Sequence, residues 1–389
     1  MIRQKLPQVQ EFLRKAGIDG WLVYDFRGTN PFATRVLNHG GNLLTRRWFV
    51  WIPAEGAPKV LVHDIEFGSF PRVGFEVAKY NSRESLLLAL RELLDGPRRV
   101  AMEYSPMGNI PYVSKVDGGT LDLVRSLSME VVSSGDVLQL FLAWTPGQLA
   151  NHHRASEVLT ATKNAALTYI RRYVESNTPL SEYQLQQYMN RFIEEQGMDP
   201  DHPPIVGFGP GTGDPHYVPS AIRSKTLEKG DAILMDLWCK VPGDNPFADT
   251  TWMAFYGTPT EPFLRAYEAV VAARDAGVNL LQSRYPEQPV RGYEVDLAVR
   301  EVLKDAGYEA NLKHRTGHSL GISTVHGEAA HFDGFETLDE RLVLPDLGFT
   351  IEPGVYFPEF GVRSEINVYS HPDRIEVTTA IQTQLDVIR

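Results

Sequence analysis

The chain has 389 residues, of which 43% are hydrophobic and 22% are charged, and its formal net charge at neutral pH is -11. This length predicts two or three domains with sizeable cores. The acidic balance argues against a nucleic-acid partner and against an anionic membrane surface, because no basic excess is present to neutralise phosphate.

The cysteine content and the hydropathy pattern bear on the compartment. Cys239 is the only cysteine, which excludes an intrachain disulfide and fits a reducing compartment. No apolar run reaches the roughly 18 residues of a membrane span, and the N-terminal segment lacks the apolar core of a signal peptide. We therefore predict a cytoplasmic protein without a membrane partner.

The first part of the chain alternates short apolar runs with helical spacing. An amphipathic segment near residues 83–95 predicts a helix. The predicted strands have the sequences GWLVYDF (residues 20–26), RRWFVWIP (46–53), PKVLVHDI (58–65) and RRVAMEY (98–104). This alternation predicts an α/β domain, which we assign to residues 1–147, up to a Pro-Gly break.

The second part, residues 148–389, separates its helices from its strands, which predicts an α+β domain. Ser181 followed by Gln184 has the spacing of a capping box at a helix start. The predicted elements are helices near 149–176, 181–197, 260–283 and 293–307, a strand-turn-strand at 231–256, and further strands towards the C-terminus.

Two predicted hairpins carry paired acids. If Asp236 and Asp249 face each other, the turn centre falls between Pro242 and Gly243, inside the turn-forming segment VPGDNP. If Glu352 and Glu365 face each other, the centre falls inside FPEFG. Directly opposed like charges destabilise a sheet, and a bound cation is the simplest reason for two such pairs.

Histidines supply a third element of the predicted site. Four of them, His314, His318, His326 and His331, lie in the segment HRTGHSLGISTVHGEAAH. Four carboxylates and one neutral imidazole would carry a formal charge of -4, which two divalent cations balance. Ligation that is rich in oxygen suits Mn²⁺ first, with Co²⁺, Fe²⁺ or Zn²⁺ as alternatives.

The motifs in the second part resemble, in order, those of the M24 or "pita-bread" metallopeptidases, and among them the Xaa-Pro peptidases prolidase and aminopeptidase P. The matching segments are GFGPGTGDPHYVPS, ILMDLW with ADTT, HRTGHSLG with VHGE, TIEPGVY and GVRSEI. The resemblance covers residues 150–389 strongly. It implies an α/β N-terminal creatinase-like domain followed by an α+β pita-bread catalytic domain.

The resemblance also implies roles for individual residues. It assigns Glu352 to proton transfer as well as to the metals, and His216 and His326 to catalysis. Independently of the resemblance, Arg363 lies two residues before Glu365 and Tyr356 lies four after Glu352, so each shares the face of that glutamate and is a candidate for substrate contact. The implied metal ligands are Asp236, Asp249, His318, Glu352 and Glu365.

We therefore expect two divalent metal ions and hydrolysis of Xaa-Pro bonds in small proline-containing peptides, in a homodimer by resemblance. A dipeptidase would also need a cationic side chain that binds the free carboxylate of the C-terminal proline. We predict Arg46 for this role, in the strand-like run NLLTRRWFVW. The alternatives are an aminopeptidase P that acts on longer peptides, a metal-free creatinase-like C–N hydrolase, a methionine aminopeptidase and a binding module without catalysis.

Overall fold

The computed structural model describes residues 2–37, 44–71, 74–96 and 98–389. The chain forms two compact units, Met1–Leu142 and Ala143–Arg389. The division comes after Leu142, whereas the sequence placed the boundary at residue 147. Residues 143–145 go with the second unit because the Trp144 amide donates to the Asp346 carbonyl at 2.7 Å and the Thr145 side chain caps the first long helix.

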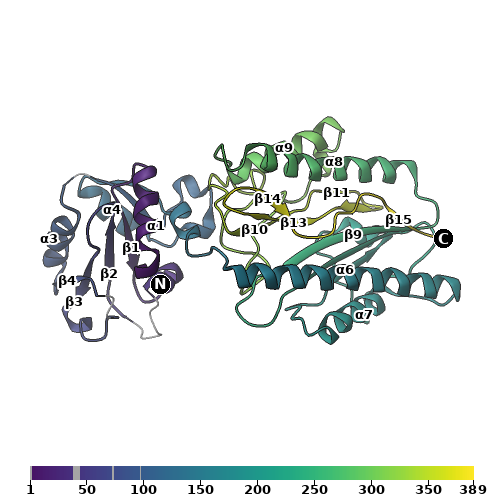
Figure 1. The fold of residues 1–389 in the computed structure, drawn as a ribbon, viewed down its shortest axis with the longest axis horizontal. Coiled ribbons are helices and arrows are strands. Elements are labelled where there is room, and N and C mark those ends of the chain that lie inside the picture. The colour runs from purple at the N-terminus through teal and green to yellow at the C-terminus, as the bar shows by residue number, and fades with distance from the viewer. Residues whose placement is uncertain (1, 38–43, 72–73, 97) are drawn as a thin grey trace. The chain divides into compact units, whose positions relative to one another are not determined.

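The first unit is built on a six-stranded mixed sheet with strand order β4-β3-β2-β1-β5-β6 (Figure 1). The four strands predicted from the sequence all lie in it. The elements of this unit are α1 (Ile2–Lys15), β1 (Gly20–Asp25), α2 (Pro31–Leu37), β2 (Trp48–Pro53), β3 (Lys59–His63), β4 (Glu76–Tyr80), α3 (Arg83–Leu94), β5 (Arg99–Met102), α4 (Gly118–Ser126), β6 (Glu130–Ser133) and α5 (Gly135–Gln139).

Both faces of this sheet are buried. On β1, Trp21 and Val23 point into one apolar core while Leu22 and Tyr24 point into the other. The alternation follows from the two-residue period of a strand. One prediction about this unit is wrong: Arg46 and Arg47 precede β2 instead of lying within a strand, and both are exposed.

The second unit holds the remaining elements of the chain. They are α6 (Pro146–Glu175), α7 (Glu182–Glu195), β7 (Ile205–Phe208), β8 (Ala232–Cys239), β9 (Ala248–Tyr256), α8 (Glu261–Arg284), α9 (Gly292–Asp305), β10 (Leu347–Ile351), β11 (Gly354–Tyr356), β12 (Gly361–Arg363), β13 (Ile366–Ser370), β14 (Ile375–Val377) and β15 (Asp386–Ile388). Within the described residues, no helix is long and apolar enough to cross a bilayer.

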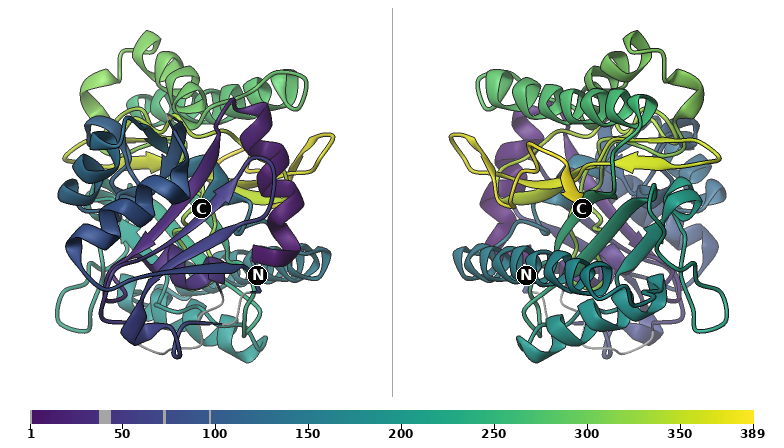
Figure 2. Two further views of the ribbon diagram at one scale, coloured as in Figure 1. Left: turned by 90° about the vertical axis from the view of Figure 1, so that its left-hand side faces the viewer. Right: turned by 90° about the vertical axis from the view of Figure 1, so that its right-hand side faces the viewer.

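Two helical layers enclose the strands of the second unit. Helices α6 and α7 lie on one side, and α8 and α9 lie on the other (Figures 1 and 2). On β8, Ile233 and Met235 pack against the α6 and α7 side, whereas Leu234 packs on the α8 side. Asp236 has the parity of Leu234, so its side chain projects towards α8 and the second hairpin.

The β8–β9 register differs from the predicted one. Asp236 pairs with Thr251, and Asp249 pairs with Trp238, so the two acids are diagonal neighbours and not directly opposed. The pairing centre lies between Gly243 and Asp244, one position after the predicted centre, so the partner of Asp236 shifts by two residues. Because a shift of two preserves the parity of a strand, both carboxylates still project from the same face.

The second predicted pairing is confirmed. Ile351 pairs with Ile366, and Gly354 pairs with Arg363, so the same register places Glu352 opposite Glu365. Both glutamates lie where the hairpin passes from the β10–β13 pair to the β11–β12 pair. At this break the two side chains are free of the regular strand geometry and can turn towards β9.

Candidate metal centre

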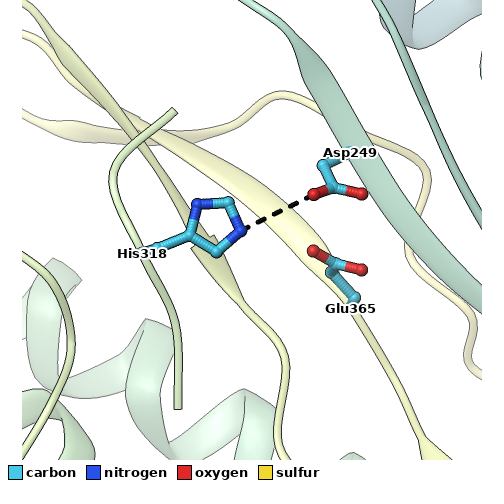
Figure 3. Close-up of side chains that lie close together, drawn as sticks. All are labelled: Asp249, His318 and Glu365. Atoms are coloured by element: carbon cyan, nitrogen blue, oxygen red, sulfur yellow. Dashed lines mark ion pairs between the residues drawn. The ribbon is translucent and has the colours of Figure 1, made fainter. Parts of the chain in front are cut away.

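Ligand atoms from three segments meet beside β9 (Figure 3). Asp249, His318 and Glu365 are all buried, and each offers one ligand atom within 4.8 Å of the others. Figure 3 shows the two carboxylates and the imidazole pointing towards a common space. This arrangement of oxygen donors with one imidazole suits a divalent transition metal.

The orientation of His318 leaves one ring nitrogen available as a ligand. Its Nδ1 lies 2.9 Å from the Ser319 carbonyl, which can only accept, so the proton belongs on Nδ1. Its Nε2 then carries a lone pair and lies 3.6 Å from Asp249 Oδ2 and 3.5 Å from Glu352 Oε1. Three electron-rich atoms facing each other need a cation or a proton between them.

Two buried oxygens at this place test whether a metal fits. Asp249 Oδ1 and Glu365 Oε1 have no hydrogen-bond partner among the described residues. A buried carboxylate oxygen without a partner costs free energy that a coordinated cation would offset. The residues present therefore fit a metal ion, and its ligands would be the two carboxylates together with His318.

Asp236 belongs to the same cluster through Thr251. The Thr251 hydroxyl lies 3.1 Å from Asp236 Oδ1 and 2.8 Å from Glu365 Oε2. It also accepts from Arg363 Nε at 2.9 Å, and the Arg363 guanidinium forms a short ion pair with Asp236. Thr251 was not among the residues predicted from the sequence, although its position two residues after Asp249 places it on the same face of β9.

Burial controls the ionisation of the cluster. It raises the pKa of Asp236 to about 6. Burial, followed by the charge of Glu352, raises the pKa of Asp249, and burial followed by Asp249 raises that of Glu365. Burial lowers the pKa of His318. Burial therefore disfavours the ionised form of these carboxylates and favours the neutral form of the imidazole.

The local fold at His318 depends on a glycine. The His318 amide donates to Thr350 Oγ1 at 2.9 Å, and that hydroxyl lies 3.2 Å from Glu352 Oε1. A Cβ atom on the preceding Gly317 would lie 2.1 Å from the Thr350 carbonyl oxygen. Glycine at this position thus allows the close backbone approach that brings His318 to Glu352.

Of the two histidines predicted for catalysis, His326 contacts His318 of this cluster, and His216 is near enough to His326 to affect its pKa. The ring of His326 is edge-on to that of His318, with centroids 4.3 Å apart. Although His326 keeps an exposed edge, desolvation of its ring and the charges of His318, Arg315 and His216 lower its pKa. His216 is exposed, and its amide donates to Asp214 Oδ1 at 3.1 Å.

The remaining predicted residues have different surroundings. The Tyr356 hydroxyl is 2.6 Å from His314 Nε2, and burial raises the pKa of Tyr356. Arg46 lies in the first unit, where its amide donates to the Glu66 carboxylate at 3.2 Å and 47% of its side chain is exposed. Cys239 is buried in an apolar core, as predicted.

The fold and the site define a metallopeptidase. Residues 150–372 match metallopeptidase family M24, and the chain belongs to that family. The predicted fold class, a creatinase-like α/β domain followed by an α+β pita-bread domain, is confirmed.

Some known relatives match over most of their length. The chain is 26% identical over 321 residues to "Probable dipeptidase PepE" of Mycobacterium tuberculosis, covering 81% of this chain and 78% of that protein. It is 25% identical over 383 residues to the Xaa-Pro dipeptidase of Pyrococcus horikoshii, covering 94% and 93%. Dipeptidase PepE from Mycobacterium ulcerans has a similar crystal structure, with a TM-score of 0.66, 24% identity and coverage of 100% and 98%.

Proposed function

We propose that this metallopeptidase hydrolyses Xaa-Pro bonds, most readily in dipeptides, with two divalent ions, Mn²⁺ first, held by Asp236, Asp249, His318, Glu352 and Glu365. The observation that carries the proposal is the pair of partnerless buried oxygens, Asp249 Oδ1 and Glu365 Oε1, beside a neutral imidazole. The names of the relatives, dipeptidase and Xaa-Pro dipeptidase, support the choice of substrate.

The bound ions would supply Lewis-acid activation of a water molecule and of the scissile carbonyl. The chain itself supplies proton transfer. Glu352 retains 14% side-chain exposure, and its Oε1 is held by the Thr350 hydroxyl at 3.2 Å. A carboxylate held in this way can carry a proton to the leaving proline nitrogen, which must be protonated before it departs.

Residues around the cluster would orient the substrate. His216 and His326, which both reach solvent, can donate hydrogen bonds to the carbonyl oxygen as charge develops on it. Arg363 holds Asp236 and carries positive charge next to the acids. Tyr356 is committed to His314, so we propose that it orients the substrate pocket rather than reacting.

The preference for dipeptides rests on a separate residue. A dipeptide presents a free carboxylate, for which a half-exposed guanidinium is a suitable partner. We propose Arg46 for this role because 47% of its side chain is exposed and its backbone is fixed by Glu66. The cytoplasmic location and the homodimer belong to the proposal as well.

The substrate test compares Ala-Pro with Ala-Pro-Pro-Ala after loading with Mn²⁺. We expect a higher kcat/KM for Ala-Pro, and we expect Arg46→Ala to raise KM for Ala-Pro while sparing the longer peptide. Faster cleavage of the longer peptide would favour the aminopeptidase P alternative. No cleavage of either peptide by the loaded protein would refute the proposed function, and the metal-free hydrolase would then be tested with creatine.

A further inference from the structure

A buried carboxylate outside the metal centre holds the segment that carries His216. Glu182 is the first residue of α7, and none of its surface is exposed. Its Oε1 accepts from the Phe208 amide at 2.7 Å. Its Oε2 accepts from the Tyr217 hydroxyl and from the Lys225 amide, both at 2.6 Å. The three donors come from the start, the middle and the end of the segment 208–225.

This carboxylate is stabilised without an ion pair. Within the part of the chain that the structure describes, no basic side chain forms a salt bridge with Glu182. Three hydrogen bonds stabilise it. Its position in the first turn of α7 also helps, because the helix dipole favours negative charge there. These donors replace water around the buried carboxylate. Removal of one of them would leave the carboxylate incompletely hydrogen-bonded, which costs free energy.

Packing around Glu182 is tight. A Cβ atom on Gly211 would lie 2.8 Å from Glu182 Oε1 and 3.3 Å from a ring carbon of Tyr217. The Tyr217 ring therefore lies against the backbone of the 3-10 helix Gly209–Gly213, which leads into His216. The hydrogen bond from the Tyr217 hydroxyl to Glu182 therefore holds the backbone in place one residue after His216.

The same segment also contacts the hairpin that bears the glutamates. The Gly361 amide donates to Thr212 Oγ1 at 2.7 Å, and Lys313 Nζ donates to the Gly213 carbonyl at 2.7 Å. The segment is thus fixed to the second hairpin before His216 and to Glu182 after it. His216 itself has only its amide bond to Asp214 among the hydrogen bonds of the described residues.

We propose that Tyr217 and Glu182 form a positioning pair that sets the place of His216 relative to the metal centre. The pair acts through the backbone of the segment and touches neither substrate nor metal. The proposal rests on the proposed function to the extent that His216 contacts the substrate.

The test is Tyr217→Phe, which removes one hydroxyl and retains the ring and both amide donors to Glu182. The matched control is Tyr183→Phe, next to Glu182 in α7. The Tyr183 hydroxyl has no hydrogen-bond partner among the described residues. We expect Tyr217→Phe to lower kcat/KM on Ala-Pro about tenfold, because the hydrogen bond to Glu182 that holds the chain next to His216 is lost. Metal content should be unchanged in both variants.

A double-mutant cycle separates positioning from general destabilisation. In the His216→Ala background, Tyr217→Phe should change kcat/KM by less than about twofold, because the residue through which it acts is missing. An equal loss in both backgrounds, or full activity of Tyr217→Phe, would overturn the inference.

Hydrogen exchange supplies a readout that does not depend on activity. Peptides covering residues 209–226 should exchange faster in Tyr217→Phe than in the wild type, while peptides covering residues 314–326 exchange at the same rate. Unchanged exchange in residues 209–226 would overturn the inference even if Ala-Pro is cleaved. Faster exchange in a protein that cleaves no Xaa-Pro peptide would support the positioning pair and refute the proposed function alone.

Discussion

At the scale of single residues, the metal assignment depends on oxygens that have no other partner. The sequence predicted a cation site because Asp236 within an apolar strand is unfavourable without a compensating charge, and the family resemblance supplied the set of five ligand candidates. The hydroxyls of Thr251 and Thr350 were not predictable. Threonine is common in strands for packing reasons alone, so only the structure shows that Thr251 joins Asp236 to Glu365 and that Thr350 joins Glu352 to the His318 amide.

His152 makes a prediction about acid stability that does not involve the ligands. It is fully buried, with Nδ1 2.9 Å from the Phe247 carbonyl and Nε2 2.7 Å from Thr378 Oγ1. Burial lowers its pKa from 6.5 to about 4, while the bond to the Phe247 carbonyl opposes this shift. The folded state therefore binds this proton less readily than the unfolded chain.

The sign of the effect follows from proton linkage. The stability that His152 contributes is complete above pH 6.5 and is lost as the pH falls towards 4, amounting to roughly 3 kcal/mol. Urea unfolding of the metal-free protein should show a shallower loss of stability over this range in His152→Gln than in the wild type. The control is His153→Gln, a half-exposed neighbour on the same helix, and equal slopes in all three proteins would refute the assignment.

At the scale of elements, the long helices and the second hairpin followed from the sequence, whereas the first register did not. Turn residues in FPEFG define a short connection, which leaves one centre for the Glu352–Glu365 pairing. The segment between Cys239 and Ala248 is longer and rich in turn formers, so several centres satisfy the same pattern. The observed register differs from the predicted one by two residues, an even number. The side chains of Asp236 and Asp249 therefore still project from the same face of the hairpin.

Substitution of Gly317 tests whether the metal site requires the close approach of the His318 segment to β10. In Gly317→Ala, the new methyl group would meet the Thr350 carbonyl, so one of the two segments must shift. We expect a loss of about 1–3 kcal/mol in the free energy of unfolding, together with weaker Mn²⁺ binding. Denaturant unfolding and calorimetric titration measure the two effects.

Gly147→Ala is the matched control, because the nearest atom to its new methyl group would be 4.0 Å away, in the first turn of α6. It should leave stability and Mn²⁺ affinity near those of the wild type. If Gly317→Ala binds Mn²⁺ as tightly as this control, the close approach at Thr350 has no role in forming the site.

At the scale of the whole molecule, the two units have separate apolar cores, and all five ligand candidates belong to the second. The change from alternating to segregated elements predicted this division, and residues 143–145 joined the second unit through contacts that the sequence does not reveal. The role proposed for Arg46 in the first unit is not determined by any local sequence pattern.

Metal binding should stabilise the two units unequally. A ligand that binds only the folded form adds about 2.7 kcal/mol at a concentration one hundred times its Kd. We expect calorimetry to show two transitions, of which Mn²⁺ raises the one that belongs to Ala143–Arg389. Hydrogen exchange assigns each transition to its unit. An equal rise of both transitions, or a rise confined to Met1–Leu142, would contradict the placement of the metal.

The most direct measurement of the central claim is the metal content of protein that has been stripped with a chelator, reloaded with Mn²⁺ and analysed by plasma mass spectrometry. The wild type and the exposed-turn control Asp244→Asn should each retain two Mn²⁺ per chain, and Asp249→Asn should retain fewer because its unsatisfied oxygen is replaced. A wild-type chain without Mn²⁺, or an Asp249→Asn chain that holds as much as the control, would contradict the account.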